Sequence, residues 1–307
     1  MYRTYSQLNQ PEYASIKIDP EESGQCLCIG ISTAHHSYDT ADNTFESDSQ
    51  YSVKLLCGVV NKQLKIAEEN IVILSPSDKL NSYKIKNIFE SIKQKHSEAP
   101  YTAVFLHIVG HAPKCDNEGF YQFDVGNDCF IHVNEIKMLL ANFASCCIII
   151  MKDFCYAEAH DLLSNLPIEP KQFRLQWSAC AKDGYAYKAG DIPGRLFSNC
   201  LATGFDGQNC PINNTRDCDV CKDYRNSENG SISYNILQDK SYYKILQDKW
   251  VEPHVRKCTE INRHYPVLNI HESCQEMFHC SLKEIMRCLL YISFICFLFY
   301  IYVSRNV

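Results

Sequence analysis

The run Ala103-Val-Phe-Leu-His-Ile-Val-Gly-His-Ala112 is the basis of the fold prediction, because an apolar segment leads directly into a glycine and a histidine. Comparable apolar runs without strict alternation occur at 26–31, 71–74, 147–151 and 174–178. Strands that are buried on both faces have this composition, as in a parallel sheet covered by helices. The sequence therefore predicts a mostly parallel sheet.

Stretches with helical spacing of apolar residues lie between the predicted strands. Their apolar positions are Val53, Leu56, Val60 and Leu64, then Ile85, Ile88, Phe89 and Ile92, then Ile136, Leu139, Leu140 and Phe143. Residues three and four apart share one face of a helix, so we interpret each stripe as a face that packs on the core. Strands that alternate with helices predict an α/β fold with right-handed crossovers and helices on both faces of the sheet.

Two of the predicted strands end next to chemically reactive side chains. His111 follows the apolar run that ends at Val109, and Cys155 follows Met151-Lys-Asp-Phe. Functional groups in such sheets gather at the carboxyl ends of the strands, where adjacent parallel strands would place these two side chains at one edge. A thiolate is a nucleophile that a neighbouring imidazole activates. The pair therefore predicts a Cys–His dyad, although a free cysteine is also commonly a small buried apolar residue.

Residues 24–205 resemble the caspase, paracaspase and metacaspase family of cysteine peptidases. The resemblance rests on Gly-His at 110–111, on Asp-Phe-Cys at 153–155, and on the segments 28–32, 69–74, 119–123 and 177–187. It implies a caspase-like fold in which Cys155 is the nucleophile and His111 the general acid and base. It also implies an oxyanion hole made by the backbone N–H groups of Ala112 and Cys155. The expected function is a cysteine endopeptidase that hydrolyses a protein or peptide substrate.

The resemblance also assigns a role to Asp153. Metacaspases and paracaspases have an acidic residue two positions before the nucleophile and cut after Arg or Lys, whereas the caspases that cut after Asp have Gln there. A carboxylate pairs with a P1 guanidinium or ammonium group. We therefore expect Asp153 in the S1 pocket and a basic P1 residue in the substrate. The alternative is that Asp153 caps the following helix.

Three departures from the family pattern favour a catalytically inactive relative that acts as a scaffold or as a regulator of active peptidases. Ala112 stands where the family usually has Gly, and Ala would strain the loop if this position needs positive φ. Val109 stands where metacaspases commonly have Ser, and the segment after Cys155 lacks the usual small or basic residues. The retained His111 and Cys155 favour the enzyme, which is our first hypothesis.

A further alternative is the legumain and glycosylphosphatidylinositol transamidase branch of these peptidases. It shares the His and Cys strand ends, and the transamidase also has a C-terminal membrane helix. That branch works in the lumen after a signal peptide. The first eleven residues of this sequence lack the apolar region of a secretory signal, so we expect a cytosolic domain whose eighteen cysteines are mostly reduced.

The composition limits the classes of partner. The 307 residues include 30 Lys and Arg against 36 Asp and Glu, for a net charge of −6, and no basic run marks a phosphate-binding stripe. We therefore expect no nucleic-acid partner. An activation step that uses calcium, self-cleavage or formation of a homodimer is left open by the residues.

Changes in amino-acid composition along the sequence divide the chain into four parts. We predict an N-terminal extension at 1–23, a peptidase core at 24–205, a smaller subdomain at 206–284 and a membrane tail at 285–307. Residues 288–303 are sixteen positions without a charge, which as a helix would span about 24 Å. This predicts a single-pass tail anchor whose folded part faces the cytosol. The alternative is a terminal core helix or strand.

The predicted subdomain contains one motif with metal-ligand spacing, Cys218-Asp-Val-Cys221. A zinc site would need two more ligands, which Cys210 with His254 or Cys258 could supply. A single CxxC is weak evidence, so we expect ordinary cysteines here, no bound metal and no cofactor, with zinc as the alternative.

Overall fold

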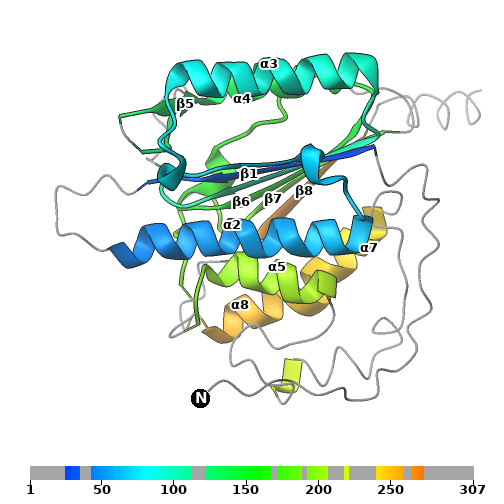
Figure 1. The fold of residues 1–307 in the computed structure, drawn as a ribbon. Coiled ribbons are helices and arrows are strands. Elements are labelled where there is room, and N and C mark those ends of the chain that lie inside the picture. Colours follow the sequence, from blue (N-terminus) through cyan, green and yellow to red (C-terminus); the bar gives the residue numbers. More distant parts are fainter. Residues whose placement is uncertain are drawn as a thin grey trace, which may run out of the picture.

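The centre of the protein is a six-stranded sheet in the order β2-β1-β3-β6-β7-β8 (Figure 1). The computed structural model describes residues 25–34, 43–112, 122–126, 128–166, 172–188, 192–206, 218–220, 240–258 and 265–272. The strands of the sheet are β1 (Cys26–Ser32), β2 (Ile71–Leu74), β3 (Ala103–Val109), β6 (Cys147–Asp153), β7 (Phe173–Ser178) and β8 (Val267–Glu272). A separate antiparallel pair consists of β4 (Gln122–Asp124) and β5 (Phe130–His132).

The sheet is mostly parallel, as predicted. All neighbouring strands from β2 to β7 pair in parallel, and only the edge strand β8 runs antiparallel to its neighbour β7. Every residue of β1, β3, β6 and β7 is buried. Burial on both faces explains why these strands appear in the sequence as continuous apolar runs.

Helices cover both faces of this sheet (Figure 1). One face is covered by α3 (Ser82–Glu98) and α4 (Val133–Ala141), and the other by α2 (Asn43–Leu64), α5 (Leu196–Asp206), α7 (Lys240–Leu246) and α8 (Glu252–Cys258). The π-helical segment η5 (Gln247–Val251) joins α7 to α8, and short 3-10 turns form η1 (Glu68–Asn70), η2 (Pro76–Asp78) and η3 (Ala157–Ala159). The three predicted apolar stripes lie in α2, in α3, and in α4 with the turn after it, and they pack into the core.

The predicted subdomain at 206–284 contributes a strand to the same sheet. Its strand β8 pairs with β7, and its helical segment is tied to the sheet through Gln247. The Trp177 indole Nε1–H donates to Gln247 Oε1 at 2.5 Å, and Gln247 Nε2 donates to the Pro266 carbonyl at 2.7 Å. The side chain of Gln247 therefore links the helix, β7 and the start of β8.

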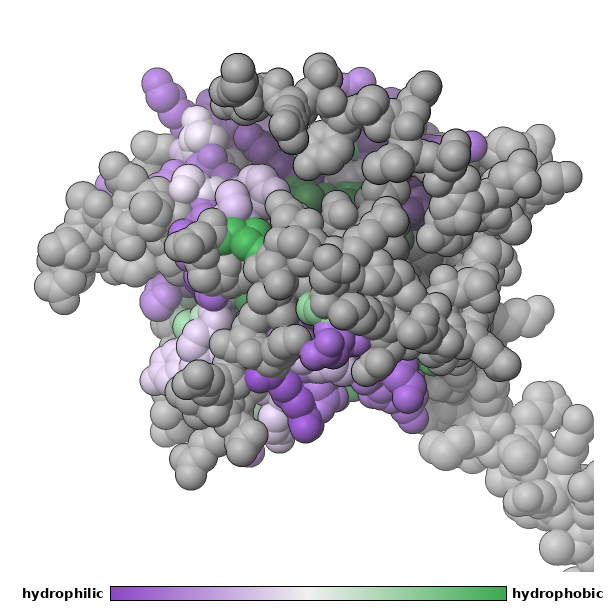
Figure 2. Space-filling view, turned by 90° about the horizontal axis from the view of Figure 1, so that it is seen from below, coloured by the Kyte–Doolittle hydropathy of each residue, from purple (hydrophilic) through white to green (hydrophobic). Residues whose placement is uncertain are grey.

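The predicted membrane tail lies outside the described residues, as does the extension at 1–23. Within the described residues, none of the helices combines the length and the apolar composition needed to cross a membrane. On the face seen from below, hydrophilic side chains predominate among the described residues, and hydrophobic ones show only in small areas (Figure 2).

Candidate active site

His111 and Cys155 lie at equivalent points beyond the ends of two neighbouring strands. β3 ends at Val109 and β6 ends at Asp153, and these two residues are register partners. The N–H of Gly110 donates to the Asp153 carbonyl at 3.1 Å, which extends the pairing by one residue. His111 and Cys155 each follow their strand end by two residues. Both therefore lie at the carboxyl edge of the sheet, where functional side chains of α/β proteins gather.

Cys155 is the accessible thiol among the ten cysteines whose side chains the structure describes. Nine other free cysteines are described and all are buried, whereas Cys155 is half-buried. The nearby Cys180 shows the contrast, because burial raises its pKa to about 12 and its Sγ donates to the Phe154 carbonyl at 3.4 Å. Cys180 is therefore a protonated core thiol, while Cys155 is half-buried and His111 is exposed.

Thr33, directly after β1, holds the backbone of the catalytic histidine candidate. Its hydroxyl accepts a hydrogen bond from the His111 N–H at 2.6 Å and donates one to the His111 carbonyl at 3.0 Å. The Thr33 N–H donates to the Val109 carbonyl at 2.8 Å. Sequence reasoning missed this residue, although a hydroxyl group just beyond the end of a neighbouring strand was a usable signal.

Gly110 is the glycine that this turn requires. Its φ is +134°, and a Cβ at this position would lie 2.1 Å from Thr33 Oγ1. An L-residue would thus meet both backbone strain and a steric clash. Ala112, by contrast, is not among the described non-glycine residues with positive φ, which are Lys65, Lys79, Asp128, Tyr156 and Asn165. The backbone strain that we considered for Ala112 required a positive φ. Ala112 does not have one.

The residue after Cys155, Tyr156, has a left-handed backbone with φ 60° and ψ 25°. Such a conformation costs a non-glycine residue about 1–3 kcal/mol and persists only where the surroundings hold it. Here the Tyr156 N–H donates to the Gly184 carbonyl at 2.8 Å, and the hydroxyls of Tyr156 and Tyr185 lie 3.2 Å apart. The hydrogen bond to Tyr185 is the largest cause that raises the pKa of Tyr156 to about 12.

The Asp153 carboxylate is fully buried and accepts hydrogen bonds from another part of the protein. Its Oδ2 accepts two hydrogen bonds from Ser198, one from the backbone N–H at 2.9 Å and one from the hydroxyl at 2.6 Å. Ser198 lies in the first turn of α5, so Asp153 caps this helix rather than the segment that directly follows it. Burial raises the pKa of Asp153, while the charge of Arg195 and the bonds from Ser198 act in the opposite direction.

His107, which lies within β3, belongs to the same buried network. Its Nε2 lies 3.1 Å from Ser198 Oγ. Because the Ser198 hydroxyl donates to Asp153, it can only accept from the imidazole, so His107 has its proton on Nε2. Burial lowers the pKa of His107 to about 3, and the side chain is therefore neutral. Sequence reasoning did not identify this network.

Arg195 lies on the other side of the Asp153 carboxylate. Its Nε is 3.9 Å from Asp153 Oδ1, and its Nη2 donates to the Ala186 carbonyl at 3.1 Å. The backbone before α5 is held by α2, since the Arg195 N–H donates to Ser52 Oγ at 2.7 Å and the Gly194 N–H donates to Asp48 at 3.0 Å. The guanidinium is thus fixed beside the carboxylate that was expected to select a basic P1 residue.

Two of the possible zinc ligands, Cys218 and His254, are in contact with each other. Cys218 Sγ lies 3.4 Å from His254 Nε2, and His254 Nδ1 lies 2.7 Å from the Trp250 carbonyl. No group of three or more His, Cys, Asp or Glu side chains suited to a metal occurs among the described residues. Cys210 and Cys221 lie outside the described part of the chain. The expectation of ordinary cysteines, with zinc as the alternative, therefore stays a prediction, as does calcium activation.

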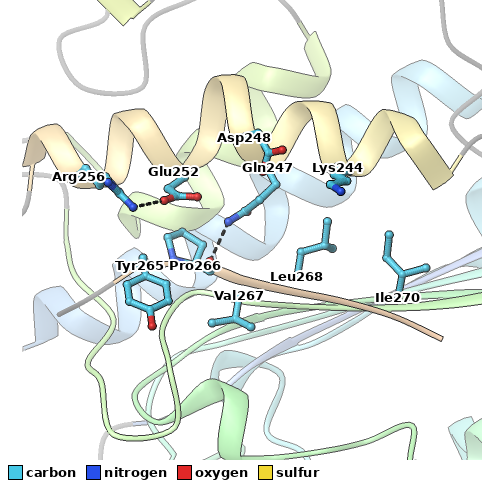
Figure 3. Close-up of a pocket in the computed structure, with 10 residues that line it drawn as sticks. All are labelled: Lys244, Gln247, Asp248, Glu252, Arg256, Tyr265, Pro266, Val267, Leu268 and Ile270. Atoms are coloured by element: carbon cyan, nitrogen blue, oxygen red, sulfur yellow. Dashed lines mark hydrogen bonds and ion pairs between the residues drawn. The ribbon is translucent and has the colours of Figure 1, made fainter. Parts of the chain in front are cut away.

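A separate groove of about 520 Å³ lies between the α7–η5–α8 segment and the edge strand β8 (Figure 3). Charged side chains line its helical wall, and Val267, Leu268 and Ile270 line its strand wall. None of His111, Cys155 and Asp153 borders it. We therefore assign it no part in the chemistry of the dyad.

No protein-family model and no curated protein matches the chain. Among solved structures, caspase-1 from Spodoptera frugiperda is similar with a TM-score of 0.47 and 11% identity over 88% of this chain and 93% of that chain. The Drosophila initiator caspase Dronc has a TM-score of 0.47 and 9% identity over 87% of this chain and 92% of its own. Raptor from Chaetomium thermophilum has a TM-score of 0.39 and 14% identity over 59% of this chain and 18% of its own. The structural neighbours thus include caspases, the family that the sequence resembles.

Proposed function

We propose that this protein is a cysteine endopeptidase in which Cys155 is the nucleophile and His111 the general acid and base. The observation that supports this assignment is the shared position of the two residues. Cys155, the one cysteine not buried among those whose burial is described, follows β6 at the same register at which His111 follows β3. A thiol and an imidazole at one sheet edge are the parts that nucleophilic catalysis by cysteine requires.

In the proposed reaction His111 takes the proton of the Cys155 thiol as its sulfur attacks the peptide carbonyl carbon. The carbonyl electron pair moves to the oxygen, and the backbone N–H groups of Ala112 and Cys155 stabilise this oxyanion. Collapse of the tetrahedral intermediate breaks the C–N bond, and His111 gives its proton to the leaving amine. His111 then deprotonates a water molecule that attacks the acyl-enzyme thioester, which releases the acid and restores the thiol.

The proposal includes Asp153 as the S1 acceptor for a P1 Arg or Lys. Ser198 donates only to Oδ2, and Oδ1 accepts no hydrogen bond from any described residue. A buried carboxylate oxygen without a donor favours a ligand that supplies one. The expected substrates are therefore proteins or peptides with a basic residue before the scissile bond.

The second candidate is a catalytically inactive scaffold or regulator of active peptidases. The observation that favours it is Tyr156, a large residue with a left-handed backbone directly after Cys155, whose ring lies 5.3 Å from that of Tyr185. We propose that a side chain of this size leaves less room for a substrate beside the Cys155 thiol. For both candidates we propose attachment to a membrane through residues 288–303, with the folded part in the cytosol.

The deciding experiment compares the full-length chain, purified in detergent, with its C155A and H111A variants. Peptides with Arg, Lys, Gln or Asp at P1 are assayed across a calcium titration, and C147A is the matched control because this thiol lies buried at the other end of β6. We expect turnover by the wild type and by C147A, and none by C155A. Absence of turnover on every peptide would favour the scaffold, whereas equal turnover by C155A would contradict the role of Cys155.

A further inference from the structure

We infer that Arg195 is a specificity-determining residue, which competes with the P1 side chain of the substrate for the Asp153 carboxylate. This inference rests on the proposed function, because it concerns the S1 pocket of the same active site. The geometry behind it involves one shared acceptor atom, one fixed cation and a buried setting.

The shared acceptor is Asp153 Oδ1. A carboxylate offers two oxygens, and Oδ2 already accepts both the N–H and the hydroxyl of Ser198. Oδ1 accepts no hydrogen bond from the described residues. The Nε of Arg195 lies 3.9 Å away, within ion-pair range but beyond hydrogen-bond distance. A P1 guanidinium that reaches this pocket would therefore form its hydrogen bond with the oxygen that Arg195 faces.

The competing cation is Arg195, whose side chain and backbone are each held by a hydrogen bond. Its Nη2 donates to Ala186, and its backbone N–H donates to Ser52 of α2. The preceding Gly194 has φ +91°, and a Cβ there would lie 2.8 Å from Ser52 Oγ, so the loop packs tightly against α2. The Arg195 side chain therefore has to break its hydrogen bond to Ala186 in order to turn away from Asp153, while its backbone stays fixed on α2.

Burial strengthens the electrostatic effect of Arg195 on a P1 cation that binds Asp153. The side chain of Arg195 is 7% exposed and that of Asp153 is 0% exposed, so solvent screens the pair weakly. A P1 cation bound to Oδ1 is attracted by the carboxylate and repelled by the guanidinium that faces the same oxygen, so the repulsion offsets part of the attraction. A neutral P1 side chain experiences neither this attraction nor this repulsion. Asp153 alone would favour basic over neutral P1 residues. Arg195 makes this preference weaker.

The test measures kcat/KM of the full-length protein on two peptides that differ only in having Arg or Gln at P1. R195Q removes the charge and also loses the hydrogen bond to Ala186, because the Gln amide ends near the position of the Arg Nε, while R195K keeps the charge and is the matched control. We expect R195Q to raise the Arg-to-Gln ratio of kcat/KM by roughly tenfold, through the Arg peptide alone, and R195K to leave it within about twofold of wild type. A purely structural role would change turnover of both peptides together.

An Arg-to-Gln ratio of kcat/KM that is unchanged or lower in folded R195Q would overturn the inference. R195M, which keeps an unbranched apolar chain as far as the position of the Arg Nε but has no charge and no hydrogen-bond donor, is measured in parallel. An Arg-to-Gln ratio of kcat/KM that fails to rise in whichever variant folds has the same meaning. Failure of the proposed function looks different, since the wild type would then cleave neither peptide, or C155A would cleave both.

Discussion

The hydroxyl of Thr33 bridges the backbone N–H and the carbonyl of His111, at 2.6 Å and 3.0 Å. Thr33 belongs to the segment after β1, so the central strand pair β1–β3 fixes the loop that presents the histidine. We expect T33V to lower kcat about tenfold, because His111 would leave its reactive position, and to reduce the free energy of unfolding by about 1–3 kcal/mol through two lost hydrogen bonds.

Peptidase assays and urea unfolding of the same preparations measure both effects of T33V. T33S is the control, since it retains the hydroxyl and should stay close to wild type. A T33V variant with wild-type kcat would show that the Thr33 hydroxyl does not position His111.

Gly110 provides the second prediction. With φ +134° and a Cβ position 2.1 Å from Thr33 Oγ1, G110A should lower the free energy of unfolding by about 1–3 kcal/mol or more and displace His111. G58A is the matched control, because Gly58 lies inside α2 with nothing within 4 Å of its Cβ position. This control should be more stable than wild type by roughly 0.5–1 kcal/mol, since glycine is a poor helix former. Equal effects of the two substitutions on urea unfolding would contradict the strain assigned to Gly110.

The buried carboxylate of Asp153 leads to a pH prediction. Burial raises the pKa of Asp153 above its ordinary value of 3.8, so the folded protein holds this proton more tightly than the unfolded chain does. The contribution of Asp153 to stability is then fully present below pH 3.8 and is lost as the pH rises through the raised pKa. The unfolding free energy of wild type minus that of D153N should therefore fall with increasing pH. Urea unfolding of both proteins across a pH series measures this difference, and a rise would show that the guanidinium of Arg195 outweighs burial.

The sequence predicted the parts of this fold that depend on local pattern. Apolar runs located the strands of the parallel sheet, and stripes located α2, α3 and α4. Gly110-His111 and Asp153-Phe-Cys155 located the candidate dyad, because strand ends can be recognised from the runs before them. The resemblance to caspases supplied the roles of the two residues.

The supporting contacts could not be predicted, because they join segments that are distant in the chain. Ser198 is 45 residues from Asp153, and Arg195 is 143 residues from Ser52. No periodicity shows that a strand-end aspartate faces the first turn of a helix so far away. The hydrogen bond from His107 to Ser198 was hidden for the same reason, since a histidine within an apolar run is indistinguishable from other core residues by pattern alone.

Ser198 is the residue on which this buried network depends. Its hydroxyl donates to Asp153 and accepts from His107, so S198A leaves two buried groups with one hydrogen bond fewer each. We expect a loss of about 1–3 kcal/mol in the free energy of unfolding. S32A is the control, because Ser32 is equally buried but its hydroxyl makes no hydrogen bond within the described residues. Thermal and urea unfolding that ranked S32A as the more damaging change would contradict this account.

The accessibility of Cys155 predicts selective alkylation. Under limiting iodoacetamide at neutral pH, Cys155 should react well before the nine buried cysteines described in the structure, because a thiol must be accessible and deprotonated to react. Cys180 is the internal reference, since burial raises its pKa to about 12 and it should stay unmodified in the folded protein. Peptide mass spectrometry over a time course measures the order, and H111A should slow the labelling of Cys155 if the imidazole activates it. Modification of Cys180 as early as Cys155 would show that the Cys155 thiol has no special reactivity.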